Sequence, residues 1–152
     1  MGAAPDGPAG PRQLKPADQV TDPGDQTGVN AGGKTIGAKE LADCLKDVGD
    51  LRLLHFGSCL VCAGDVPRQI HEALGPSARF PITGYTKVAD WGGSAVVDFT
   101  YLDLVLARGV EPAEAVRQTR KMVSFAGDKG GPWDAIPAAG LVVIEPKGGA
   151  AK

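Results

Sequence analysis

The thiol of Cys59 is the group in this 152-residue sequence that is best placed for chemistry. It follows Gly57-Ser58 at the end of residues 51–56 (LRLLHF), an apolar run with little alternation. Such a run predicts a strand that is buried on both faces, and ligands of open α/β sheets bind beyond the carboxyl ends of parallel strands. We therefore interpret Cys59 as a candidate nucleophile.

Cys59 and Cys62 also have the spacing of a thioredoxin-type dithiol. In such a pair, the N-terminus of the following helix lowers the pKa of the first thiol. The spacer Leu60-Val61 is apolar here, and free cysteine is often a buried core residue. We favour that interpretation for Cys62, and a dithiol oxidoreductase that uses both thiols stays open as an alternative function.

A metal site would need both histidines, His55 and His71, to converge with Cys59 and Cys62. Structural zinc sites usually draw their ligands from two closely spaced pairs, and the second pair is missing. His55 lies in the predicted strand and His71 in a predicted helix, 66–74, where we expect structural roles for both. We therefore predict no metal site, and the sequence indicates no other cofactor.

Residues 28–35 (GVNAGGKT) satisfy the phosphate-binding pattern G-x-x-x-x-G-K-[ST]. In a true P-loop, a buried strand delivers the chain into the loop, whose N–H groups surround the phosphates. Residues 21–27 (TDPGDQT) are too polar to be that strand. Nucleotide binding at 28–35 is therefore the function that we favour least.

Hydrophobic patterning predicts alternating helices and strands beyond residue 34. The expected helices span 38–48, 66–74, 95–108 and 112–125, and the expected strands span 51–56, 80–85 and 140–145. This alternation is typical of a parallel sheet with crossover helices, and so of an α/β fold. In helix 95–108 we expect one buried apolar stripe, formed by Val96, Phe99, Leu102, Val105 and Leu106.

One domain is expected, at 34–146. Residues 1–33 are dominated by Gly, Pro, Ala, Asp and Gln, and a segment that buries so little apolar area predicts a disordered tail. Residues 147–152 predict a flexible C-terminal tail. Three strands are few for a parallel sheet, which needs covered faces and protected edges. We therefore expect a partner chain, or further copies in a homo-oligomer, to complete the sheet.

Taken as a set, these segments resemble the caspase-like (clan CD) cysteine peptidases, in their CHAT-type branch. The similar stretches are 33–36 (GKTI) ahead of Glu40-Leu41-Ala42, the nucleophile strand 53–59 (LLHFGSC), 80–85 (FPITGY), Ala89-Asp90-Trp91 before a long helix, 109–115 (GVEPAEA) and 141–145 (LVVIE). The resemblance covers about 36–146 and matches the C-terminal half of such a domain. It implies a caspase-like half domain, a three-layer sandwich with a small, mostly parallel sheet.

In this family the cysteine thiolate attacks a peptide carbonyl, and a histidine on the preceding strand serves as general base. The resemblance implies that Cys59 is the catalytic residue, that its backbone N–H is one oxyanion donor, and that Asp90 and Trp91 contact a peptide or protein substrate. The family histidine should lie upstream of Gly32, and residues 1–32 contain none.

We do not expect His55 to replace the missing base. It precedes Cys59 by four residues on the same strand, about 13 Å away at ~3.3 Å per residue, which exceeds hydrogen-bond reach. We therefore expect a partial domain without peptidase activity of its own, a pseudoenzyme unless another chain supplies the base. A non-catalytic interaction module, which needs neither Cys59 nor Cys62, is the remaining alternative.

Net charge, apolar runs and the first residues of the chain indicate which partners and which compartment to expect. There are 16 Lys and Arg against 18 Asp and Glu, a formal net charge of −2, so we expect no nucleic-acid binding. No apolar run approaches the ~20 residues of a membrane span, so we expect no membrane association. The first residues have neither the basic nor the apolar region of a secretory signal. We therefore expect a cytoplasmic protein.

Overall fold

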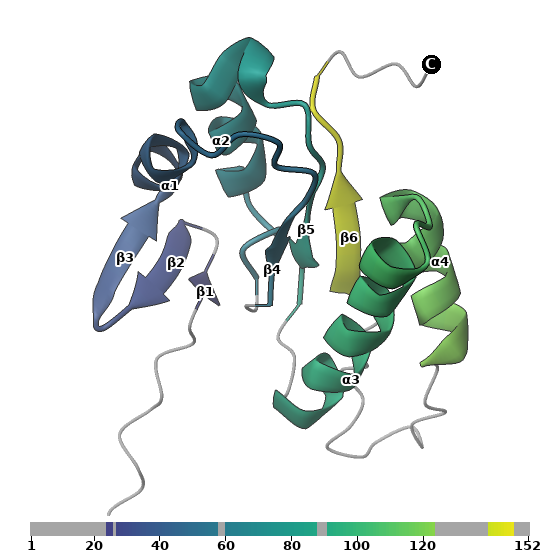
Figure 1. The fold of residues 1–152 in the computed structure, drawn as a ribbon. Coiled ribbons are helices and arrows are strands. Elements are labelled where there is room, and N and C mark those ends of the chain that lie inside the picture. Colours follow the sequence, from purple (N-terminus) through teal and green to yellow (C-terminus); the bar gives the residue numbers. More distant parts are fainter. Residues whose placement is uncertain (1–23, 26, 58–59, 88–90, 124–139, 148–152) are drawn as a thin grey trace, which may run out of the picture.

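The computed structural model describes residues 24–25, 27–57, 60–87, 91–123 and 140–147, which form a mixed α/β fold with two small sheets (Figure 1). The four α-helices of these residues are α1 (Ala38–Leu45), α2 (Val66–Leu74), α3 (Trp91–Leu102) and α4 (Pro112–Met122). A 3₁₀ turn, Gly75–Ser77, follows α2, and a π-helical turn, Asp103–Ala107, continues α3. None of the described helices is long and apolar enough to cross a membrane.

The central sheet has the strand order β4 (Leu54–Phe56), β5 (Ile82–Tyr85), β6 (Leu141–Ile144). Strands β4 and β5 are parallel, with Leu54 opposite Ile82 and Phe56 opposite Gly84. Strand β6 is antiparallel to β5, with Leu141 opposite Tyr85. The prediction of an α/β fold is confirmed. The expected direction, mostly parallel, holds for β4 and β5 and does not hold for β6.

The direction of β6 follows from the number of helices before it. Helix α3 begins beside the carboxyl end of β5, where the hydroxyl of Tyr85 donates to the backbone oxygen of Ser94 over 3.4 Å. Helix α4 then brings the chain back to this end, because Arg120 donates to the backbone oxygen of Leu141 over 2.6 Å. After two helices the chain re-enters the sheet at the end that it left, so the new strand runs the opposite way.

Helices cover both faces of the central sheet, and the result is three layers (Figure 1). On one face, α1 and α2 pack against each other and against β4 and β5, around Phe56, Ile70 and Ile82. On the other face, α3 and α4 enclose a second apolar cluster around Tyr101 and Leu141. Burial of these two clusters is the main force that holds the layers together.

The second sheet is antiparallel and comprises β1 (Gly24–Asp25), β2 (Gly28–Ala31) and β3 (Lys34–Gly37). Between β2 and β3, Gly32 and Gly33 adopt φ values of 59° and 80°, the left-handed values that a two-residue hairpin turn requires. The phosphate-binding pattern at 28–35 therefore coincides with a β-hairpin. Residues 28–33 belong to this hairpin, which differs from the prediction of a disordered tail as far as residue 33.

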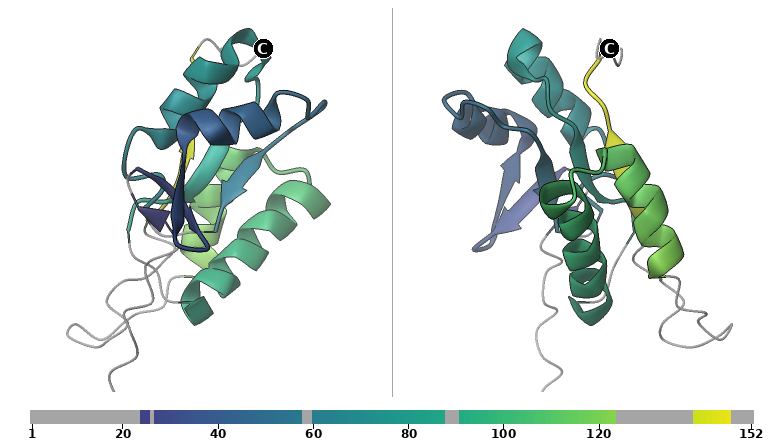
Figure 2. Two further views of the ribbon diagram at one scale, coloured as in Figure 1. Left: turned by 90° about the vertical axis from the view of Figure 1, so that its left-hand side faces the viewer. Right: turned by 45° about the vertical axis from the view of Figure 1, so that its right-hand side comes forward.

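Helix α3 turns a different face to the sheet from the one that we expected. Phe99 is 76% exposed, Leu106 69% and Val96 46%, whereas Val97, Tyr101 and Leu104 are buried. The predicted stripe is therefore wrong at these three exposed positions. The helix itself carries apolar residues on nearly all of its sides, so their periodicity did not define which side packs against the sheet. The view in the right half of Figure 2 shows α3 and α4 on the outside of the sheet.

Candidate functional site

The candidate site lies at the carboxyl end of the parallel pair β4 and β5. Gly57 directly follows β4, and Thr86 follows β5 at the same end of the sheet. Cys59 and Asp90 lie outside the described residues. Trp91 begins α3, but its side chain is also outside the described part. The structure therefore describes the strands and the helix that lead to the predicted site residues, and the side chains that these elements carry.

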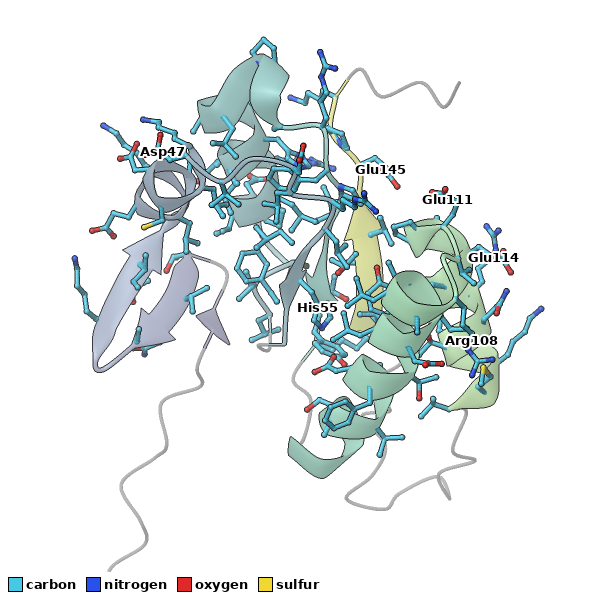
Figure 3. All side chains as sticks on the ribbon, viewed as in Figure 1. Asp47, His55, Arg108, Glu111, Glu114 and Glu145 are labelled. Carbon is cyan, nitrogen blue, oxygen red and sulfur yellow. The ribbon has the colours of Figure 1, made fainter. Side chains whose placement is uncertain are left out.

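A polar cluster occupies the face of this end that α3 covers. The Nε2 atom of His55 lies 3.0 Å from Oδ1 of Asp98, and its Nδ1 atom lies 2.8 Å from Oγ1 of Thr83. The hydroxyl of Tyr85 donates to the same Asp98 oxygen over 2.6 Å. We call His55, Thr83, Tyr85 and Asp98 the His–Asp cluster; Figure 3 labels His55 between the sheet and α3.

Each side chain of the His–Asp cluster is placed by its own element. His55 and Thr83 sit opposite each other in the β4–β5 register, so their side chains leave the same face of the sheet. Tyr85 is two residues beyond Thr83 and points to that face as well. Asp98 comes from α3. The cluster is little exposed, with 12% of the His55 side chain and 21% of the Asp98 side chain accessible.

The connectivity hydroxyl–imidazole–carboxylate resembles a catalytic triad, but it does not provide a nucleophile. Thr83 is fully buried, so a substrate carbonyl has no route to its Oγ1. Both ring nitrogens of His55 are also engaged, one by Thr83 and one by Asp98. A histidine must present a free ring nitrogen to take a proton from a thiol. In this arrangement His55 is a structural group.

Asp98 also approaches the turn that leads away from β4. A Cβ atom built on Gly57 would lie 3.2 Å from Oδ2 of Asp98, closer than an ordinary van der Waals contact. The two oxygens of the carboxylate therefore face different groups. Oδ1 accepts from His55 and Tyr85, and Oδ2 lies next to the space that a side chain at position 57 would enter.

The second histidine lies at the other end of the sheet. His71 is buried on α2, where its Nε2 atom is 3.0 Å from the backbone oxygen of Phe80. Phe80 precedes β5, whereas Gly57 follows β4, and the two strands are parallel. Burial lowers the pKa of His71, although its bond to Phe80 acts in the opposite direction. The chain has two histidines, and neither is placed to serve the strand end beyond Gly57.

The two described cysteines differ strongly in their exposure to solvent. Cys44 is exposed on α1, whereas Cys62 is buried in the cluster under α1 and α2. Burial raises the pKa of the Cys62 thiol to about 12. A thiol of this kind stays protonated near neutral pH and is a poor partner in dithiol exchange. Among the described residues, no group of three or more His, Cys, Asp or Glu side chains could hold a metal ion.

Comparisons with known protein families, curated protein sequences and solved structures find no match to this chain. The candidate function therefore depends on the residues and the geometry described above.

Sequence reasoning did not identify Asp98, Thr83 or Tyr85 as parts of the site. A signal for Asp98 was present, because Ser94, Asp98 and Tyr101 are spaced by four and three residues, which puts them on one face of an apolar helix. A polar stripe on such a helix indicates that the surface against which the helix packs carries polar groups that can form hydrogen bonds with it. The partners, in contrast, could be found only from the pairing of β4 with β5.

Proposed function

We propose that this chain is the nucleophile-bearing half of a caspase-like cysteine peptidase domain of the CHAT type, with Cys59 as nucleophile and without peptidase activity of its own. The observation that carries the proposal is the end of β4. Its parallel neighbour β5 ends beside it, and the chain leaves at Gly57 toward Cys59. In open α/β sheets this is the edge at which ligands bind.

In the proposed reaction, the Cys59 thiolate bonds to the carbonyl carbon of a peptide and the C–N bond breaks. The departing amine needs a proton, and the thiol must first lose one. Neither histidine of this chain can carry these protons, because His55 is engaged on both sides and His71 lies at the opposite end of the sheet. The base must therefore come from outside the chain. Asp90 and Trp91 are the proposed substrate contacts.

We propose that a partner chain or a second copy supplies the base through the open edge of β4. Among the described strands, β4 pairs with β5 alone. Leu54 donates its N–H to Pro81, so the alternation along the strand turns the N–H of His55 toward the other edge. Phe99 on α3 and Leu106 on the π-helical turn that continues it are also exposed, and the proposed partner would cover these two apolar side chains. The proposed location is the cytoplasm.

Chemical rescue tests the proposal. The purified chain is incubated with a pool of peptidyl acyloxymethyl ketones, with and without imidazole as an external base, and labelled thiols are mapped by mass spectrometry. In this reaction the thiol sulfur displaces the carboxylate leaving group, and imidazole takes the thiol proton. We expect imidazole to accelerate labelling of Cys59 more than labelling of Cys44, the exposed reference thiol.

Three other results would point elsewhere. Equal acceleration at Cys59 and Cys44 would overturn the nucleophile assignment and favour an interaction module. Cleavage of peptides by the purified chain that is lost in Cys59→Ala would overturn the statement that the chain is inactive alone. A peptide in which Cys59 and Cys62 are joined by a disulfide, recovered from the chain kept without reductant, would favour the dithiol oxidoreductase.

A further inference from the structure

We propose that Arg52 and Arg79 form a binding site for a small amphipathic anion, a carboxylate or phosphate head on an apolar body. The site lies at the amino ends of β4 and β5, at the end of the sheet opposite to Gly57. It goes beyond the proposed function and does not rest on it. Three features carry the inference: a hollow in the surface, two arginines without partners, and an apolar floor.

The hollow has a volume of about 450 Å³, within the range of pockets that hold small molecules. The last turns of α1 and α2 line it, together with Arg52 and Arg79 from the segments that enter β4 and β5. The two strands are parallel, with Leu54 opposite Ile82, so both arginines precede the sheet at the same end. The fold therefore brings two guanidinium groups from separate segments to one hollow.

Both of these arginines are exposed and lack a partner. Every other arginine in the described part of the chain forms an ion pair or a hydrogen bond, namely Arg68, Arg108, Arg117 and Arg120. Arg52 and Arg79 form neither with any residue that the structure describes. Asp50 also lines the hollow, but it pairs with neither arginine. The free guanidinium donors have the geometry that carboxylate and phosphate oxygens accept in pairs.

The ends of α1 and α2 do not hold the two arginines. Carbonyl groups at the C-terminus of a helix attract cations, and both helices end at the hollow. Within the described part of the chain, however, Arg52 and Arg79 donate to no carbonyl oxygen. Lys46, at the end of α1, is already paired with Asp43. The positive charge of the two arginines is therefore available to an anion from outside the chain.

Apolar side chains form the floor of the hollow. Phe80 is buried there, and Leu51 and Leu74 pack against the apolar cluster under α1 and α2 while remaining partly exposed. Val48, also in the lining, is 48% exposed. A ligand with an apolar body would cover these side chains while its head meets the guanidinium groups. A head alone would gain only exposed ion pairs, which contribute little.

Titration of the full chain with octanoate, followed by nuclear magnetic resonance, tests the site. We expect octanoate to shift the signals of the lining and to bind about tenfold or more tightly than 1-octanol, which has no charge, and acetate, which has no apolar body. Arg52→Gln and Arg79→Gln should each weaken octanoate binding by about tenfold or more. Arg68→Gln, at an exposed arginine of α2 outside this lining, is the matched control and should change the affinity by less than about twofold.

Octyl phosphate, titrated in parallel, identifies the head group. Tighter binding of octyl phosphate would assign a phosphate to the site, and tighter binding of octanoate would assign a carboxylate. Either result supports an anion site, and the spectra of the variants also report on their folding. The proposal would be overturned if 1-octanol or acetate bound as tightly as octanoate, or if both arginine variants kept the full affinity. It would equally be overturned if neither anion shifted the signals of the lining at millimolar concentration. Because no thiol takes part in this measurement, its failure leaves the proposed function of Cys59 unchanged.

Discussion

His55 on β4 and Asp98 on α3 form a hydrogen-bonded pair, with Nε2 of the histidine 3.0 Å from Oδ1 of the aspartate. The pair joins the edge strand of the central sheet to the helix that covers it, and Thr83 and Tyr85 of the neighbouring strand complete its hydrogen bonds. The link is partly buried, so each member depends on the other for compensation of its lost hydration.

Truncation of Asp98 to Ala should lower the free energy of unfolding by about 2 kcal/mol, because the buried hydroxyl of Tyr85 and the partly buried ring of His55 lose their acceptor. Asp103→Ala, on the continuation of the same helix, should change it by about 0.5 kcal/mol or less, since its ion pair with Arg108 is exposed. Chemical denaturation measures both values.

A double-mutant cycle separates the pair from its parts. His55→Leu with Asp98→Leu should cost less than the sum of the two single changes, because no polar group of the pair is then left without its partner. Additive effects of the two substitutions would contradict an energetic coupling between β4 and α3.

Two aromatic residues of α3, Tyr101 and Phe99, should respond very differently to truncation. Tyr101 is fully buried and Phe99 is 76% exposed. We expect Tyr101→Ala to destabilise the fold by about 3 kcal/mol or more, the usual cost of removing a buried aromatic ring. Phe99→Ala should cost about 0.5 kcal/mol or less, as at other surface positions. Equal losses would mean that α3 presents its other face to the sheet.

Gly84 should not tolerate a side chain. A Cβ atom at this position would lie 2.9 Å from Sγ of Cys62 and from the backbone oxygen of Phe56. Gly84→Ala should therefore destabilise the fold by about 1–3 kcal/mol through overpacking. Gly49→Ala is the control, because its Cβ would meet nothing within 4 Å, and thermal unfolding can compare the two.

Alkaline pH should weaken the fold through Cys62. Burial raises the pKa of this thiol from 9.0 to about 12, so between these pH values the unfolded chain has lost a proton that the folded chain keeps. Stability that is present below pH 9 is therefore lost as the pH rises toward 12. We expect unfolding measurements at pH 8 and 10.5 to show a smaller loss in Cys62→Ala than in the unmodified chain. Cys44→Ala, which changes an exposed thiol, should lose as much as the unmodified chain.

Acidic pH should lower the stability of the fold through His71. Burial lowers its pKa below 6.5, so on acidification the unfolded chain takes up a proton before the folded chain does. The stability contributed by the neutral ring is present above pH 6.5 and is lost as the pH falls below it. His71→Gln retains a donor for the Phe80 oxygen and does not titrate in this range. The drop in melting temperature between pH 7.5 and pH 5.5 should therefore be smaller in this variant, and an equal drop would contradict the assignment.

The sequence by itself determined where most elements lie. Helix 66–74 was predicted with the bounds that α2 has, and β4, β5 and β6 fall within the predicted strands. These segments have local signals, namely Pro67 and Gly75 at the ends of α2 and short apolar runs in the strands. Because each of these segments can bury its apolar residues in only a few ways, the bounds predicted from the local pattern agree with those in the folded chain.

Only the tertiary structure decided the direction of β6, the inner face of α3 and the partners of Asp98. Two consecutive helices precede β6, and their combined path returns the chain to the end of the sheet that it had left. Helix α3 carries apolar residues on nearly all of its sides, so hydrophobicity alone gives no preferred face. The hydrogen bonds of Asp98 with His55 and Tyr85 determine which face of α3 packs against the sheet. These bonds join positions more than ten residues apart, and short-range patterns carry no information about such pairs.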